Sequence, residues 1–121
     1  MKAGVNIRVL DTYALMAIAG GDPAYAPYIV QDFVIPDTTL AEFKWVLMRD
    51  FSVEIASDWI EKLAPYADGV ERGHLLDAMD FRFAHRAKKI SFFDAVGYVF
   101  AKRLGCLFVT GDEAFRGMHG V

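Results

Sequence analysis

Four acidic residues of this 121-residue chain stand at positions that a hydrophobic core alone does not explain. Asp11 directly follows one short apolar run, and Asp112 follows another, separated from it by a threonine and a glycine. Glu42 and Asp94 each fall near the start of a helical pattern of apolar residues. Carboxylates act as general acids and bases, and they are ligands for hard cations. The four positions are therefore candidates for chemistry.

Helix capping is the simpler explanation for each acid taken alone. Asp11 and Asp112 are suited to be N-caps, and the pairs Thr39-x-x-Glu42 and Ser91-x-x-Asp94 match the capping box. Capping satisfies one helix end at a time, however, and does not require that several acids converge. The arrangement of the surrounding elements decides between the two explanations.

The pattern of apolar residues alternates between strand and helix along the chain. We expect strands at residues 5–10, 33–35 and 106–110. We expect helices at residues 12–19, 23–30, from 39 onward, 52–65, 71–88, 92–104 and 113–116. Short apolar strands alternating with helices predict an α/β fold with a buried parallel sheet, in a single domain over residues 1–121.

A parallel sheet brings ligand-binding residues together beyond the carboxyl ends of its strands. If the four acids gathered there, each pair of like charges at about 4 Å would cost roughly 4 kcal/mol at an effective dielectric near 20. That is a large share of a domain's stability of about 5–15 kcal/mol. The cluster must then bind protons or a cation, and an all-oxygen set favours Mg²⁺ or Mn²⁺. Such an ion suits the hydrolysis of phosphate diesters, the chemistry of a nuclease.

Composition excludes several other classes of protein. With 55% hydrophobic and 24% charged residues the chain is globular, and its apolar runs are shorter than the roughly 20 residues of a membrane span. Because Cys106 is the only cysteine, an internal disulfide and a cysteine-rich zinc site are excluded. The N-terminus lacks a signal-peptide pattern, so we expect a cytoplasmic protein. A net charge of −3 leaves room for only a local basic patch.

Basic and aromatic residues supply possible contacts to a nucleic acid. Seven basic side chains could bind phosphates: Lys44, Arg49, Arg82, Arg86, Lys88, Lys89 and Arg116. Five aromatic side chains could stack on bases, although packing in the core or in a subunit interface is the commoner reason for such residues: Tyr25, Tyr28, Phe33, Phe43 and Trp45. The apolar stripe of residues 55–63, with Tyr66, could form a groove for a partner.

Four stretches of the chain together resemble the PIN domain, and most closely the VapC-type toxin ribonucleases. They are "VLDTYAL" (9–15), "TTLAEF" (38–43), "SFFDAVGYVFAKRLG" (91–105) and "LFVTGDEAF" (107–115). The resemblance runs over nearly the whole chain in the right order. A haloacid-dehalogenase-type phosphatase needs a second acid two residues after the first, where this chain has Tyr13.

The resemblance implies a three-layer α/β/α domain with a short central parallel sheet, which hydrolyses single-stranded or structured RNA with Mg²⁺ or Mn²⁺. The residues that match the family's metal-binding and catalytic acids are Asp11, Glu42, Asp94 and Asp112. Asp11 and Asp94 correspond to the main metal ligands, while Thr12 and Thr110 match supporting hydroxyl residues. Partners implied are an antitoxin protein and a second copy of the chain in a homodimer. Relatives continue into a last edge strand, which Val121 could begin.

Two alternatives remain open within this interpretation. A housekeeping RNA-processing nuclease would use the same four acids. A non-catalytic binding or assembly module would keep the fold without turnover. The sequence does not separate these possibilities from the toxin.

Overall fold

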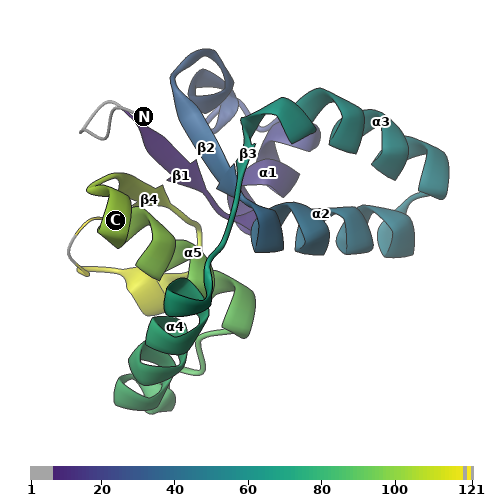
Figure 1. Ribbon diagram of the computed structural model, residues 1–121. Coiled ribbons are helices and arrows are strands. Elements are labelled where there is room, and N and C mark those ends of the chain that lie inside the picture. The colour runs from purple at the N-terminus through teal and green to yellow at the C-terminus, as the bar shows by residue number, and fades with distance from the viewer. Residues whose placement is uncertain (1–6, 119, 121) are drawn as a thin grey trace.

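A computed structural model describes residues 7–118 and 120 of the chain. Its centre is a parallel sheet of four short strands in the order β3-β2-β1-β4 (Figure 1). The strands are β1 (Arg8–Leu10), β2 (Phe33–Pro36), β3 (Ala67–Asp68) and β4 (Leu107–Val109). The pairing of β1 with β4 joins segments from opposite ends of the sequence, with Leu10 opposite Val109.

Among the described residues, five α-helices and four short 3₁₀ helices lie between the strands or, for the last of them, after β4. The α-helices are α1 (Thr12–Ala19), α2 (Asp37–Asp50), α3 (Val53–Leu63), α4 (Arg72–Ala84) and α5 (Phe92–Leu104). The 3₁₀ helices are η1 (Ala26–Val30), η2 (Ala64–Tyr66), η3 (Arg86–Lys88) and η4 (Glu113–Phe115). Among the described residues, no helix is long and apolar enough to cross a membrane.

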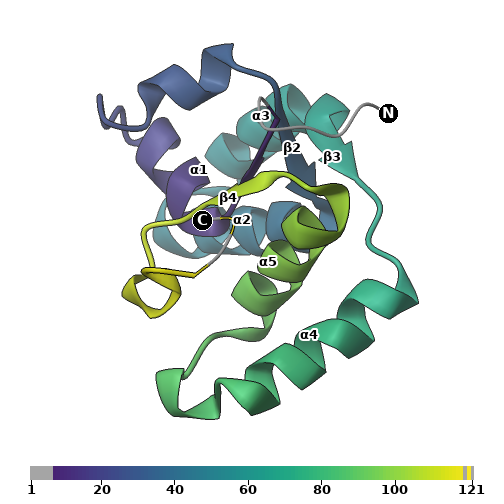
Figure 2. The same ribbon diagram turned by 90° about the vertical axis from the view of Figure 1, so that its left-hand side faces the viewer.

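The helices cover both faces of the sheet and form two hydrophobic clusters. On one face α4 and α5 pack with β4 around Phe100 and Phe108. On the other face α1, α2 and α3 pack around Phe43 (Figures 1 and 2). Neighbouring residues of β1 serve opposite faces, since Val9 belongs to the first cluster and Leu10 to the second. The expected three-layer α/β/α fold with a parallel sheet is confirmed.

The expected elements differ from the observed ones in a few places. Helix α2 begins at Asp37 after Pro36, so Thr39 lies inside the helix and Thr39-x-x-Glu42 is not a capping box. The helix expected over 71–88 ends at Ala84, and the chain then turns through η3 to Lys89, which has a left-handed backbone with φ 56°. Residues 23–30 form only the 3₁₀ helix η1, and β3 was not expected at all.

The carboxyl end of the chain runs beside β4. The backbone N–H of Phe108 donates a hydrogen bond to the carbonyl of Gly120 at 2.7 Å. Val121, which was expected to begin another strand, lies outside the described residues.

Gly97 allows α5 to approach the sheet closely. A Cβ atom at this position would lie 2.9 Å from Cε1 of Phe108, whose ring is buried. We expect Gly97→Ala to push α5 away from β4 and to destabilise the protein by about 1–3 kcal/mol. Urea denaturation would measure this change. Gly105→Ala is not a neutral control because φ is 69° there, but Gly69→Ala meets no neighbouring atom and should change stability much less.

Candidate functional site

The ends of two neighbouring strands bring Asp11 and Asp112 to the same edge of the sheet. Asp11 follows β1, and its backbone N–H donates to the carbonyl of Val109, the last residue of β4, at 3.2 Å. Asp112 follows β4 after a short turn at Thr110 and Gly111. This is the edge at which parallel sheets bind ligands.

Glu42 and Asp94 approach this edge from two helices on opposite faces of the sheet. Glu42 lies on α2 and Asp94 in the first turn of α5. The charges of Glu42 and Asp112 raise the pKa of both Asp11 and Asp94. The structure therefore gathers the four acids into one electrostatically coupled group.

Asp11 is the most deeply buried member of the group, with 2% of its surface exposed. Its Oδ1 atom caps α1 by accepting a hydrogen bond from the Ala14 N–H at 2.8 Å. Its Oδ2 atom is buried and accepts no hydrogen bond from a described residue. Burial raises the pKa of Asp11 to about 6, and the nearby Thr110 hydroxyl and Ala14 amide offset only part of the effect. Capping and a site role are thus compatible, because they use different oxygen atoms.

Asp94 is half-buried, and its pKa is raised further than that of Asp11. Burial, followed by the charges of Asp11, Glu42 and Asp112, raises its pKa to about 7. A hydrogen bond with Ser91 partly opposes this shift. Ser91 also caps α5 by accepting a hydrogen bond from the Asp94 N–H at 3.1 Å, so the sequence prediction for this cap is confirmed.

Two threonine side chains form hydrogen bonds with the remaining two acids, Glu42 and Asp112. The Thr12 hydroxyl donates a hydrogen bond to Oε1 of Glu42 and so links α1 to α2. The Thr110 hydroxyl accepts a hydrogen bond from the Asp112 N–H at 3.0 Å, and Oδ1 of Asp112 caps η4 through the Ala114 N–H at 2.9 Å. Thr12 and Thr110 therefore each contact one of the four acids.

The chemistry of this group suits a divalent cation. All four side chains offer hard oxygen donors, one buried carboxylate oxygen has no partner among the described residues, and burial together with the charges of neighbouring acids raises two pKa values. The side chains are nevertheless not already drawn together as a ligand set. Within residues 7–118 and 120, no three His, Cys, Asp or Glu residues are placed to hold one ion. Binding of one ion by three of them would require the carboxylates to move closer together.

Residues near the acids show one further feature that the sequence analysis missed. The Oγ1 atom of Thr38 is buried and has no hydrogen-bond partner among the described residues. Thr38 lies four residues before Glu42 and so shares its face of α2. The four-residue spacing between Thr38 and Glu42 in "TTLAEF" is the sequence signal from which Thr38 could have been predicted.

Glu113 and Arg116 lie beside the group without joining it. Glu113 is exposed and forms an ion pair with Arg116, whose Nη2 atom lies 2.8 Å from Oε1. A hollow of about 390 Å³ lies between Thr110 and Gly117, with Arg116 on its wall. Of the expected basic residues, Arg116 is placed next to the strand end that carries Asp112.

Comparison with known proteins defines the class to which this fold and site belong. Residues 8–120 match the PIN domain. The chain belongs to the PIN domain family. No curated protein matches the chain in sequence.

Solved structures with the same fold include toxins of toxin–antitoxin systems. VapC20 of Mycobacterium tuberculosis, a toxin that cleaves the sarcin–ricin loop, is 18% identical with a TM-score of 0.75, over 94% of this chain and 98% of that one. A toxin–antitoxin complex of Klebsiella pneumoniae is 15% identical with a TM-score of 0.73, over 94% of each chain. VapBC2 of Rickettsia felis, bound to a promoter DNA fragment, is 16% identical with a TM-score of 0.68, over 86% of each chain. At these identities the likeness is one of fold.

Proposed function

We propose that this protein is a metal-dependent endoribonuclease and the toxin of a VapBC-type toxin–antitoxin pair. The observation that carries the proposal is the coupled group of four acids, in which two pKa values are raised, at the carboxyl edge of a PIN-domain sheet. Nothing in helix capping requires such a group. Repulsion of this kind is relieved when a divalent cation binds.

The residues would divide the work of the site as follows. Asp11 and Asp94 would hold Mg²⁺ or Mn²⁺, and Glu42 and Asp112 would hold a further ligand, a water or a second ion. The bound ion would activate a water, orient the phosphate and neutralise the leaving oxygen. The Ala14 amide fixes the rotamer of Asp11, and the Thr12 hydroxyl fixes that of Glu42.

Because the pKa of Asp94 is raised, proton release from this residue is part of the mechanism. With a pKa of about 7, the carboxyl group is partly protonated at neutral pH. To serve as a ligand it must release that proton, so ligand binding and proton release are coupled. The site should therefore bind its ion more weakly as the pH falls below about 7.

Exposed apolar side chains on the α2–α3 side support a protein partner. Trp45, Phe51, Val53 and Ile55 are between 42% and 62% exposed. The stripe of residues 55–63 is for the most part not available, because Ala56 and Leu63 are buried and Trp59 packs against Phe43. An antitoxin and a second copy of the chain, in a cytoplasmic homodimer, are the partners we propose from the resemblance and from the VapBC structures that share this fold.

The direct test is an RNA cleavage assay. The purified chain is incubated with end-labelled RNA across titrations of Mn²⁺ and Mg²⁺, with a chelator in parallel. We expect internal cleavage that requires the divalent ion and stops when it is chelated. Cleavage that persists in the chelator would contradict metal dependence, and no cleavage of any RNA would favour the non-catalytic binding module.

A further inference from the structure

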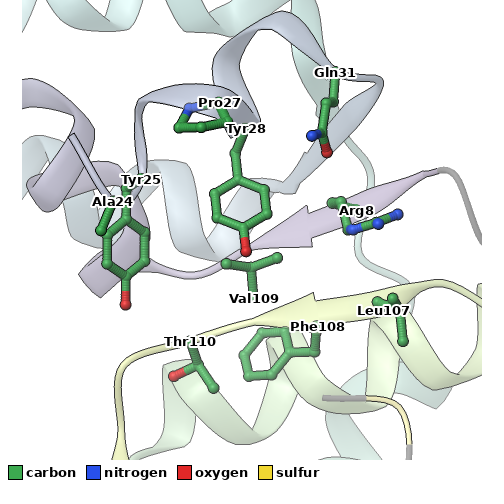
Figure 3. Close-up of a pocket in the computed structure, with 10 residues that line it drawn as sticks. All are labelled: Arg8, Ala24, Tyr25, Pro27, Tyr28, Gln31, Leu107, Phe108, Val109 and Thr110. Carbon is green, nitrogen blue, oxygen red and sulfur yellow. The ribbon is translucent and has the colours of Figure 1, made fainter. Parts of the chain in front are cut away.

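A cleft of about 610 Å³ opens next to the acidic group (Figure 3). One wall is the segment around η1, which contributes Tyr25, Tyr28 and Gln31, and the other is β4. Thr110 lines the cleft at one end, and it also contacts the backbone of Asp112. One end of the cleft therefore lies close to Asp112, although none of the four acids is among its described lining residues. Its volume lies in the range of about 300–1,000 Å³ typical of ligand sites.

Three tyrosine rings form a row from the acidic group into this cleft. Tyr13 is 56% exposed and packs so closely on Gly111 that a Cβ there would lie 2.2 Å from its ring. The ring centroids of Tyr13 and Tyr25 are 5.8 Å apart, and those of Tyr25 and Tyr28 are 6.0 Å apart. The rings are tilted by 54° and 53°, so they are not stacked on one another. Tyr25 and Tyr28 also pack against the hydrophobic cluster around Phe43, and part of each of these two residues remains exposed.

The row is close to the acids as well as to the cleft. Burial, Tyr13 and the Asp11 carboxylate raise the pKa of Tyr25, so its hydroxyl stays protonated and uncharged at neutral pH. In Figure 3, Tyr25 and Tyr28 extend from the η1 segment toward β4, with Tyr28 directed at Val109. A molecule that reached the acids along this path would pass the three rings in order.

The cleft is better suited to bind a polyanion than the acidic group is, because of the charge that lines it. The described residues that line it include Arg8, which is a cation, and no acid. Gln31 offers both a donor and an acceptor for the edge of a base. Aromatic rings with nearby polar groups are the means by which proteins bind single-stranded nucleic acids, because every base has a face that can stack.

We propose that this cleft is the subsite for the unpaired nucleotides of single-stranded RNA that flank the scissile phosphate, with Tyr13, Tyr25 and Tyr28 as stacking positions. The inference rests on the proposed nuclease function, and it assigns residues outside the acidic group to the binding of the RNA substrate. Unpaired bases can reach the rings, whereas bases in a duplex are stacked on one another and cannot. The tyrosines are binding residues and take no part in bond cleavage.

The test measures binding apart from cleavage. Asp94→Asn serves as the parent protein, and fluorescence anisotropy with Mg²⁺ present follows its binding to a short fluorescein-labelled oligouridine. Adding Tyr13→Ala or Tyr28→Ala should raise Kd by about tenfold each, the scale of one lost stacking contact. Tyr28→Phe keeps the ring and should bind like the parent. Tyr66→Ala, which removes a 47% exposed tyrosine next to β3 at the opposite edge of the sheet, is the matched control.

Two further measurements locate the bound strand. Binding of a duplex RNA should be insensitive to the tyrosine substitutions. Photo-crosslinking of an oligouridine that contains 5-iodouridine should give adducts at the tyrosine row when mapped by mass spectrometry. Circular dichroism confirms that each variant is folded.

The outcomes separate this inference from the proposed function. Cleavage activity with an unchanged Kd in Tyr13→Ala and Tyr28→Ala would keep the nuclease and overturn the subsite. Binding that depends on the tyrosines, in a protein that never cleaves RNA, would keep the subsite and overturn the nuclease. Equal loss in Tyr66→Ala, crosslinks elsewhere on the surface, or no binding of oligouridine would each overturn the subsite.

Discussion

Without divalent ions, the protein should be more stable at pH 5 than at pH 8. The pKa values of Asp11 and Asp94 are about 6 and 7 in the folded protein, against 3.8 for an ordinary aspartate. Because the folded state holds these protons more tightly than the unfolded state does, their contribution is fully present below about pH 4 and is lost as the pH rises through 6 and 7. Each pKa unit corresponds to about 1.4 kcal/mol.

The expected loss of stability between pH 5 and pH 8 is about 2–3 kcal/mol, after allowance for the partial exposure of Asp94 and its coupling to Asp11. Urea denaturation in a chelator at several pH values would measure it. Asp94→Asn should flatten the dependence, whereas Asp80→Asn, an exposed site on α4, should leave it unchanged. Stability that stays level or rises over this range in the native chain would contradict the repulsion described for the four acids.

Divalent ions should act on stability in the opposite sense. At pH 8 the carboxylates are ionised and ready to bind, so Mn²⁺ should raise the unfolding temperature markedly. At pH 5 the ion must displace protons first, and the gain should be smaller. The difference between the two pH values identifies the protonated acids as the binding groups.

Asp94→Asn should reduce metal-dependent RNA cleavage by about 10²–10³-fold, the scale for loss of one preorganised charge-stabilising group in an active site. Asparagine preserves the size of the side chain, and the Ser91 cap of α5 uses only the backbone N–H of residue 94. The fold should therefore survive, and in the ion-free protein at pH 8 the variant should even be more stable than the native chain. Gain of stability with loss of activity is the combined signature of a functional carboxylate.

The matched control for this variant is again Asp80→Asn, which makes the same chemical change outside the site. It should cleave RNA at the native rate. Cleavage by Asp94→Asn within a few-fold of the native rate, under conditions in which it depends on metal, would remove Asp94 from the proposed ligand set. Unfolding of the variant would be seen by circular dichroism and would also contradict the expected gain in stability.

The sequence predicted the convergence of Asp11 and Asp112 because apolar strands followed by acids place those acids at one edge of a parallel sheet. It also predicted the helices that carry Glu42 and Asp94, since their apolar periodicity is strong. Local patterns were less informative where tertiary contacts decide the outcome. The start of α2 follows Pro36 instead of the Thr39 signal, and β3 is only two residues long.

The details of the site could not be predicted from sequence patterns, for a different reason. The unpartnered oxygens of Asp11 and Thr38 depend on which side chains fill the space around them. The cleft beside Tyr25 and Tyr28 exists because the segment around η1 faces β4, and these two segments are about 80 residues apart in the sequence. The periodicity of apolar residues within one helix or strand carries no information about such a contact.

The pairing of β1 with β4 also determines when in the life of the chain the site can exist. Arg8 pairs with Leu107, so β1 gains this neighbour only after the residues between them have been made. Contacts of such long sequence separation form late because closing the loop between them is entropically costly. Asp11 cannot meet Asp94 and Asp112 before those residues have been made, so the acidic group is among the last parts of the fold to assemble.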